Sequence, residues 1–406
     1  MSWGRSCKLP ASSCTLKLQA ERIKRQSVVP SLANTGWLLG QLLFAALIIS
    51  LYLSFFMLKA DLNSKPIPVI GSLRGIAASM VCFDHFISTV GYIENEKIKS
   101  AFALGRTGVF IFFVISGIVI PLSMIRGGYT IGNWGNFMLK RVARLEPPYL
   151  ASIILALCYF KIRMIIAGSS AVHLPVFPSS KDVALHIGYL VPFAGAKWIQ
   201  PPYWTLCIEF QYYIALSLLL PLALNGNSKS RYCFYFIFLA IPFILPHDAF
   251  FPLYAPLFLI GILYAFSIMN IIESKEYLNV TALCIVVSFI TLPFVDTIAA
   301  GLLTLLIVQY LPGLTNKVLK FLGNISYSIY LIHKITGSAL INILSHRFRA
   351  GYQKPIVIMT GYLFTIACSY VFYRIIEKNS QKLSSRIKYK KHDPSLSVDG
   401  KMDQVV

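Results

Sequence analysis

The sequence is poor in charged residues, and acidic residues are the scarcest. Of its 406 residues, 13% are charged and only 16 are Asp or Glu, whereas 56% are hydrophobic. Soluble domains carry about a quarter of charged residues, so this composition excludes an ordinary soluble globular fold. With a mean hydropathy of +0.66, the chain is expected to be an integral membrane protein.

Paired cysteines, internal repeats and low-complexity tracts are also lacking. The 8 cysteines are scattered along the chain, without the paired spacing of a disulfide framework or a metal site. They are therefore interpreted as small hydrophobic residues. We expect no metal centre.

Long apolar runs dominate what is present. A membrane-spanning helix needs about 20 apolar residues, and unbroken runs do not have the alternating pattern of a barrel strand. The predicted fold class is therefore all-α, a polytopic transmembrane helical bundle with a ten-helix core plus one N-terminal apolar helix. The apolar segments lie near residues 36–57, 70–90, 107–125, 147–166, 203–223, 232–247, 250–269, 278–295, 298–312, 320–343 and 355–376.

These segments divide the chain into four predicted regions. Residues 1–35 form a basic polar leader, and residues 36–65 contain the extra apolar helix, whose placement stays open. Residues 66–380 form the ten-helix domain. Residues 381–406 are expected to be a basic, flexible tail.

The net charge of +21 does not indicate a nucleic-acid partner, because Lys and Arg gather in loops and in the tail, where they face lipid head groups. If the segment at 70–90 starts in the cytoplasm, the cytoplasmic loops carry 17 basic residues against 8 on the other side. The positive-inside rule then places both ends of the ten-helix core in the cytoplasm and the longest loop, 167–202, outside. If segment 36–57 also spans the membrane, the six basic residues of the leader lie outside. The count is then 17 basic residues on the cytoplasmic side against 14 on the other side.

Arg74 and His85 lie eleven residues apart in an otherwise apolar segment. Titratable side chains are costly inside a bilayer, so each is a candidate functional residue. Eleven steps of about 100° return a helix almost to its starting direction, and a rise of about 1.5 Å per residue separates the two groups by roughly 16 Å on one face. A basic group near one membrane face and an imidazole deeper in suit a site that holds a phosphorylated donor and uses a base farther along.

Lys140, Arg141 and Arg144 precede two prolines at the predicted cytoplasmic boundary of a helix. Arg141 and Arg144 are three residues apart and share a helical face. The guanidinium group presents a fork of donors that matches phosphate oxygens, which favours phosphate binding. The alternative is that these charges only fix topology.

Other motifs place polar groups inside apolar segments. Ser116 precedes Gly117, and small residues at such positions often serve helix packing. Glu209 follows Trp204 by five residues, and a buried carboxylate there must be paired, protonated or directed into a cavity. Pairing with a neighbouring Arg or Tyr is the structural alternative for Glu209.

A late stripe consists of Tyr327, Tyr330 and His333, which are spaced three residues apart. This spacing puts all three on one face of a helix. A structural histidine with satisfied hydrogen bonds is the common alternative to a functional role for His333.

Together these motifs resemble the acyltransferase-3 family of integral membrane O-acyltransferases, which includes acetylases of O-antigen, exopolysaccharide and nodulation factors. The similarity covers about residues 66–380, and the motifs follow the family's order. The matching motifs are Arg74 with His85, Gly108 to Gly117, Arg141 with Arg144, Trp204 to Glu209, Gly323 to His333 and Tyr373 to Lys378.

The chain departs from the family pattern at two positions. Phe110 stands where many relatives carry an acidic residue, and Asn379 stands where proline is frequent. The chain also lacks room for the soluble hydrolase-like domain that some relatives append. The resemblance therefore implies the membrane-only branch of the family.

The resemblance implies transfer of an acyl group, expected to be acetyl, from cytoplasmic acyl-CoA to a hydroxyl of a surface glycan or a lipid-linked sugar. Acyl-CoA, here acetyl-CoA, is then the donor substrate, and no bound cofactor is expected. The other partners are the glycan acceptor and membrane lipids. The expected location is a bacterial inner membrane, with the C-terminus in the cytoplasm.

The resemblance also assigns roles to the candidate residues. The basic side chains of Arg74, Lys140, Arg141 and Arg144 would hold the CoA phosphates. The catalytic candidates are His85 and Glu209: neutral His85 takes a proton from the acceptor hydroxyl, directly or through an acyl-enzyme, and Glu209 either orients His85 or binds the acceptor. The residues expected to bind the acceptor or to serve structure are Trp204, Tyr327, Tyr330, His333 and Ser116.

Two rival functions remain open from the sequence. Buried Arg, His and Glu side chains also serve proton relays, so a transporter or flippase of a lipid-linked sugar is the main alternative. Transporters often show internal repeats with matching broken helices, and no such pairing is evident here. The second rival function is that of a non-catalytic subunit with the same fold. The chain keeps all of the motif residues, which argues against this alternative: Arg74, His85, Arg141 and Arg144.

Overall fold

The computed structural model describes residues 67–88, 92–167, 177–292 and 295–389, and all of them belong to one compact unit that begins at Phe55. Secondary structure in these ranges is entirely helical, which confirms the predicted all-α class. The leader and the apolar segment at 36–57 lie outside the described residues. The long helices are α3 (Pro68–Ser88), α5 (Thr107–Arg126), α6 (Trp134–Ala167), α8 (Tyr203–Leu224), α9 (Ser228–Ile244), α10 (Phe251–Ile268), α11 (Ser274–Thr291), α12 (Val295–Tyr310) and α16 (Lys354–Phe372).

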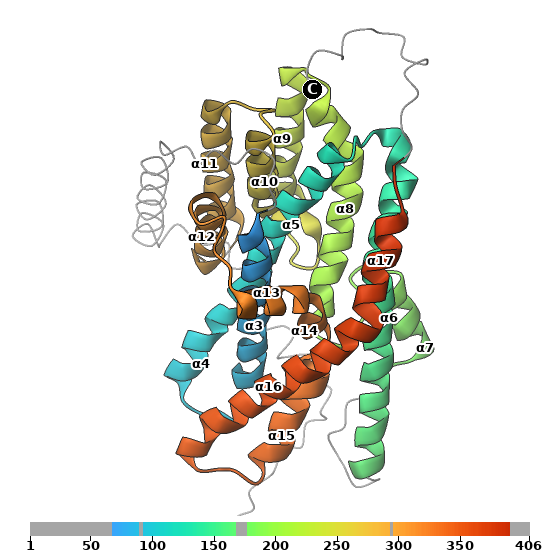
Figure 1. The fold of residues 1–406 in the computed structure, drawn as a ribbon, viewed down its shortest axis with the longest axis vertical. Helices are drawn as coiled ribbons and strands as arrows, with labels where there is room; N and C mark the ends of the chain where they lie inside the picture. Colours follow the sequence, from blue (N-terminus) through green and yellow to red (C-terminus); the bar gives the residue numbers. More distant parts are fainter. Residues whose placement is uncertain (1–66, 89–91, 168–176, 293–294, 390–406) are drawn as a thin grey trace, which may run out of the picture. The chain divides into compact units, whose positions relative to one another are not determined.

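Shorter helices complete the described part of the chain (Figure 1). They are α4 (Glu96–Ala103), α7 (Ser180–Ile187), α13 (Lys317–Asn324), α14 (Ser326–Ile332), α15 (Ala339–Ser345) and α17 (Lys378–Arg386). Two π-helical turns, η4 (Lys334–Ser338) and η6 (Tyr373–Glu377), interrupt the C-terminal part.

Five helical stretches within the described residues are long and apolar enough to cross a membrane, which supports the predicted membrane bundle. Three of them, Ile131–Ile166, Tyr203–Leu224 and Gly351–Arg386, are at most half buried, as expected for surfaces that face lipid rather than water. The stretches are Glu96–Arg126, Ile131–Ile166, Tyr203–Leu224, Phe251–Ile268 and Gly351–Arg386. The ten-helix count of the core stays a prediction.

Helix α10 forms the centre of one half of the bundle, where it packs against α5, α9 and α11 (Figure 1). The helix is hydrophobic on all sides and almost wholly buried, as a central helix should be. Gly117 of α5 and Gly261 of α10 allow the two backbones to touch. A Cβ atom on Gly117 would lie 2.2 Å from the carbonyl oxygen of Phe258, so only glycine permits this crossing.

The apolar segment at 320–343 does not form one continuous helix. Helix α13 ends at Asn324, and Ile325 leaves the helical path with φ −99° and ψ 6°. A Cβ atom on Gly323 would lie 2.2 Å from the carbonyl oxygen of Gly71. The chain is therefore divided where α13 presses against the start of α3, and α14 begins in a new direction that directs Tyr327 to α6, Tyr330 to α8 and His333 to α3.

The predicted flexible tail at 381–406 requires a correction for its first residues. The structure places residues 381–386 in α17, which continues the tilted α16 helix and packs against α6 (Figure 1). Asn379 does not end the helix as a proline would, and its side-chain amide donates to the carbonyl of Ile375 (2.7 Å). The polar sequence concealed this helix because its contacts with α6 are hydrogen bonds rather than apolar contacts. Residues 390–406 lie outside the described part.

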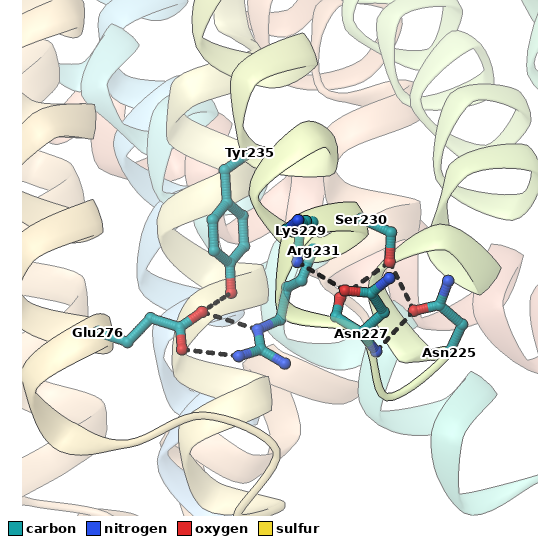
Figure 2. Close-up of polar contacts among 7 residues, drawn as sticks. All are labelled: Asn225, Asn227, Lys229, Ser230, Arg231, Tyr235 and Glu276. Carbon is teal, nitrogen blue, oxygen red and sulfur yellow. Dashed lines mark hydrogen bonds and ion pairs between the residues drawn. The ribbon is translucent and has the colours of Figure 1, made fainter.

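An ion pair joins α9 to α11 near the turn that follows α8 (Figure 2). Both nitrogens of the Arg231 fork bond the Glu276 carboxylate, at 2.7 and 2.9 Å, and Tyr235 donates to the same carboxylate. Asn227 caps α9 by accepting from the backbone N–H of Lys229 (3.0 Å). This bidentate pair is structural and lies apart from the cavity described next.

Candidate active site

A cavity of about 470 Å³ lies between α3, α5, α6, α8, α14 and the η6–α17 segment. Its lining combines four basic side chains, two carboxyl groups, several hydroxyl groups and an apolar wall from α5 and α8. The candidate residues that line it are Arg74, Ser116, Lys140, Arg141, Arg144, Glu209, Tyr327 and Tyr330. Motifs that are far apart in the sequence therefore meet around one space.

Arg141 is the most buried cation of the cavity, with 6% of its surface exposed. Its Nε and Nη2 atoms are buried and have no hydrogen-bond partner among the described residues. The guanidinium lies over the rings of Phe137 and Tyr213, at 5.0 and 5.6 Å from the centroids. These cation–π contacts hold the group in place but leave its donors free for an anion.

The other three basic residues line the same cavity as Arg141. Arg144 lies almost one turn further along α6, and Lys140 precedes Arg141. The charge of Arg74 on α3 is repelled by Arg144 and attracted by Glu377 and Glu209. Within the described ranges no ion pair is formed by any of the four cations, so the cluster is a site with excess positive charge.

Helix α17 fixes the position of the basic part of α6. The Ser380 hydroxyl donates to the carbonyls of Ala143 and Arg144 at 2.6 and 2.7 Å, and the Ser384 hydroxyl donates to the carbonyl of Lys140 at 2.8 Å. Because the Lys140 and Arg144 carbonyls are bonded to α17, this stretch of α6 cannot turn away. The cationic side chains on it are thereby held toward the cavity.

Two carboxyl groups border the cationic cluster. Glu377 is 2% exposed, and its Oε2 atom accepts from the backbone N–H and hydroxyl of Ser328 at 3.2 and 2.5 Å. Glu209 accepts from Ser116 (3.1 Å) and from the hydroxyl of Tyr213 (2.5 Å). Glu209 thus points into the cavity, which His85 does not line, and its role in acceptor binding or in orienting His85 stays a prediction.

The end of the cavity away from the arginines is closed by aromatic side chains. The hydroxyls of Tyr330 and Thr205 share a 2.7 Å hydrogen bond, and the ring of Phe112 packs edge-on against Tyr330. Tyr327 lines the cavity closer to the arginines, where it donates to the carbonyl of Leu145 (3.0 Å), the residue that follows Arg144. The end beside Tyr330 is suited to a thin, largely apolar chain.

His85 and His333 lie beyond Tyr330 and do not line the cavity itself. Their ring centroids are 5.0 Å apart, and the ring of Tyr330 is 6.2 Å from that of His333. His85 is half-buried, whereas His333 has 0% exposure. The structure therefore joins the two histidines to each other, and joins both to the cavity through Tyr330.

Trp204 does not line the cavity. Its ring packs against Phe113 and Tyr254, with centroids 6.5 and 5.9 Å apart. This surrounding gives it a packing role within the aromatic cluster between α5, α8 and α10. Any contact between Trp204 and an acceptor remains a prediction.

Several lining residues were not singled out as site residues from the sequence. Glu377 belongs to the closing signature, but its burial beside Arg74 becomes visible only in the fold. Gln381, Ser384 and Ser385 lie in the supposed tail, and Thr205 and Tyr213 flank motif residues without standing out. Proximity to Trp204 and Glu209 was the available signal for the last two. In the parts of the chain that are described, no group of His, Cys, Asp or Glu could hold a metal ion.

The fold and this site define an integral membrane helical protein with a cationic cavity between its helices, which Tyr330 separates from two neighbouring histidine side chains. Comparison with protein families matches residues 67–374 to the acyltransferase domain of the acyltransferase-3 family. The chain belongs to this family, as its motifs predict, and it is a membrane acyltransferase. No curated protein and no solved structure matches the chain.

Proposed function

We propose that this protein moves an acyl group, acetyl in the first place, from cytoplasmic acyl-CoA to a hydroxyl of a surface glycan or a lipid-linked sugar. The proposed setting is a bacterial inner membrane with the C-terminus in the cytoplasm. Membership of an acyltransferase family favours this function over transport of a lipid-linked sugar.

The observation that carries the donor assignment is the buried, unpaired guanidinium of Arg141 beside three further cations. An isolated buried charge is strongly unfavourable unless an opposite charge or hydrogen bonds compensate it. The phosphates of acyl-CoA supply both, and the planar fork of Arg binds phosphate through paired hydrogen bonds. In this proposal Arg74, Lys140, Arg141 and Arg144 hold the phosphates, and the pantetheine arm extends toward Thr205 and Tyr330.

His85 supplies the base in this proposal. Its Nδ1 atom lies 2.9 Å from the carbonyl of Val81, and because a carbonyl only accepts, Nδ1 carries the proton and Nε2 is left basic. As the acceptor oxygen attacks the thioester carbon, its proton goes to Nε2, the carbon–sulfur bond breaks and the thiolate leaves. In an acyl-enzyme variant of the mechanism, His85 receives the acyl group before the acceptor does.

The Thr205–Tyr330 hydrogen bond closes the cavity on the side of the imidazoles. For the thioester to reach His85, these two hydroxyls must part when the donor binds. Side-chain rotation of this kind is a small step compared with the opening of a helix bundle.

The test uses the purified full-length protein in detergent, labelled acetyl-CoA and the glycolipid fraction extracted from the membranes of the expressing bacterium. The proposal predicts saturable transfer of label to a glycan-containing lipid. Heat-inactivated protein is the control. Binding of acetyl-CoA without any transfer of label would instead support the transporter.

A further inference from the structure

His333 is a fully buried histidine beside His85, and the proposed mechanism with a single base gives it no role. It follows α14 directly, has 0% exposure and lies with its ring centroid 5.0 Å from that of His85. The rings of Phe86 and Tyr330 flank it at 6.3 and 6.2 Å. His333 is therefore held by packing directly behind the proposed base.

The hydrogen bonds of His333 determine which of its nitrogens is basic. Nδ1 lies 2.9 Å from the carbonyl of Tyr330 and 3.2 Å from that of Ile329. Both partners only accept, so Nδ1 carries the proton and Nε2 is a bare acceptor. Nε2 is buried without a hydrogen-bond partner among the described residues. Buried acceptors of this kind are rare in proteins and call for an explanation.

The backbone next to His333 is also unusual. The carbonyl of His333 accepts from the N–H of Ser338, five residues ahead, at 3.1 Å, which begins the π-helical turn η4. Turns of this type occur often at functional sites because they re-aim neighbouring side chains. This irregularity is independent of the unpaired nitrogen, and both concern the same residue.

The charged and titratable groups around the pair belong to α3, α14 and η4. Lys334 carries a positive charge near both imidazoles, and Asp84 carries the opposite charge near Lys334. Cys82 and Tyr330 are the other titratable neighbours. Among these groups, Nε2 of His333 is a buried acceptor on a ring whose centroid lies 5.0 Å from that of His85, so it is well placed to accept from a protonated His85.

We propose that His333 is the proton-sharing, positioning partner of His85 during acyl transfer, an inference that rests on the proposed role of His85 as the base. Two imidazoles at this ring separation can bring two nitrogens within hydrogen-bond distance. After Nε2 of His85 has taken the proton from the acceptor hydroxyl, the ring turns so that this N–H donates to Nε2 of His333, and the two nitrogens then share the proton. It passes to the departing CoA thiolate, which leaves both histidines neutral for the next cycle.

The test is the pH profile of acetyl transfer from labelled acetyl-CoA to the same glycolipid fraction by the His333→Asn variant. The asparagine amide still offers an N–H to the Tyr330 carbonyl but removes Nε2. We expect kcat to fall by about 10- to 100-fold, because general-base assistance is weakened, with a KM for acetyl-CoA within about twofold of wild type. The acid limb of the kcat profile should move by about one unit toward lower pH, because coupled groups titrate as a pair.

Controls separate this inference from the proposed function. His346→Asn, at an exposed histidine, should leave both rate and profile unchanged. If His333→Asn does not accumulate in the membrane, His333→Gln is used for the same test. Its amide, like that of asparagine, cannot take up a proton as an imidazole does. A wild-type rate in the variant, or a reduced rate with an unshifted profile, overturns the inference alone. Full transfer by His85→Ala overturns the inference and the proposed base together.

Discussion

Arg141 illustrates how one side chain can indicate a ligand. Its guanidinium is 6% exposed, and two of its nitrogens have no partner within the described structure. A group used only for topology would sit at the membrane surface in contact with water and lipid phosphates. The burial of Arg141 inside a cavity therefore favours binding over topology.

The first prediction concerns Arg141→Gln. Loss of charge-assisted hydrogen bonds worth about 1.5–3 kcal/mol should weaken donor binding. The KM for acetyl-CoA should rise by about 10- to 100-fold at this energy, with kcat changed much less. The matched control is Arg163→Gln, which removes the same charge near the other end of α6, outside the cavity. An unchanged KM in Arg141→Gln would return the residue to a topogenic role.

At the residue scale, the sequence predicts the chemical role of a side chain better than it predicts which other side chains it contacts. Spacing places Arg74 and His85 on one stripe, and residue type predicts that Arg141 and Arg144 bind phosphate, which stays a prediction. The pairing of His85 with His333 was not predictable, because residues 248 positions apart in the chain meet only when α14 folds onto α3. The same holds for Glu377, whose partner Ser328 lies on another helix.

At the scale of elements, close contact between helices determines where the cavity can form. Gly117 and Gly261 bring α5 against α10, and α5 also packs against α3, α12 and α8. In lipid, apolar side chains gain no hydrophobic free energy when they move from acyl chains to another helix. Small residues instead favour helix association, because they allow the backbones to approach closely.

Gly117→Ala tests the α5–α10 contact. The added methyl group would lie 2.2 Å from a backbone oxygen that cannot move independently, and overpacking of this kind costs about 1–3 kcal/mol. The melting temperature of the detergent-purified protein should fall, and activity should fall with it. Gly135→Ala is the matched control, because no atom lies within 4 Å of its added methyl. Equal melting temperatures for the two variants would argue against a tight α5–α10 crossing.

Helix α7 offers a pH-dependent test of the segment that contains it, which lies outside the predicted spanning helices. Nδ1 of His186 donates to the carbonyl of Asp182 (2.6 Å), and Nε2 accepts from the N–H of Ile199 (2.9 Å). Burial lowers the pKa of His186 below its ordinary value of 6.5. Protonation would also destroy the acceptor for Ile199. The neutral form therefore stabilises the fold above about pH 6.5, and this stabilisation is lost as the pH falls.

The prediction is a difference in melting temperature between pH 7 and about pH 5, near and below the ordinary pKa of histidine. The wild-type protein should lose more stability over this range than His186→Gln, whose amide can replace both hydrogen bonds without titrating. Identical pH dependence in the two proteins would show that His186 does not couple the loop to pH.

Element boundaries were predictable to the extent that hydropathy defines them. The apolar runs anticipate α5, α8 and α10 closely, since long apolar segments form helices in lipid. The break at Ile325 was missed because its cause, the contact of Gly323 with Gly71, is tertiary. Helix α17 was missed because its serines bind α6 through hydroxyl groups, a contact that a hydropathy pattern does not report.

At the scale of the whole molecule, the distribution of basic residues sets the proposed orientation. Lys140, Arg141 and Ser384 line the cavity, and the segments around them, 126–146 and 377–406, belong to the side that carries more basic residues. Acyl-CoA is a cytoplasmic metabolite in this proposal, so the cationic end of the cavity and the C-terminus should share the cytoplasmic side.

Reporter fusions test this orientation. Green fluorescent protein fused after Val406 should fluoresce, and alkaline phosphatase at the same position should be inactive, because each is active on one side only. Truncation with fusion after Lys197, in the outward loop, should reverse both signals. The opposite pattern would place the arginine cluster on the side without acyl-CoA and contradict the proposed donor route.

The most direct measurement combines acetyl-CoA binding with single-turnover transfer in His85→Ala. The account predicts an unchanged Kd for acetyl-CoA, because the cationic cavity is intact, together with no detectable transfer of label to the glycolipid fraction. Transfer at the wild-type rate would contradict the central claim that the donor held by Arg141 reacts at His85.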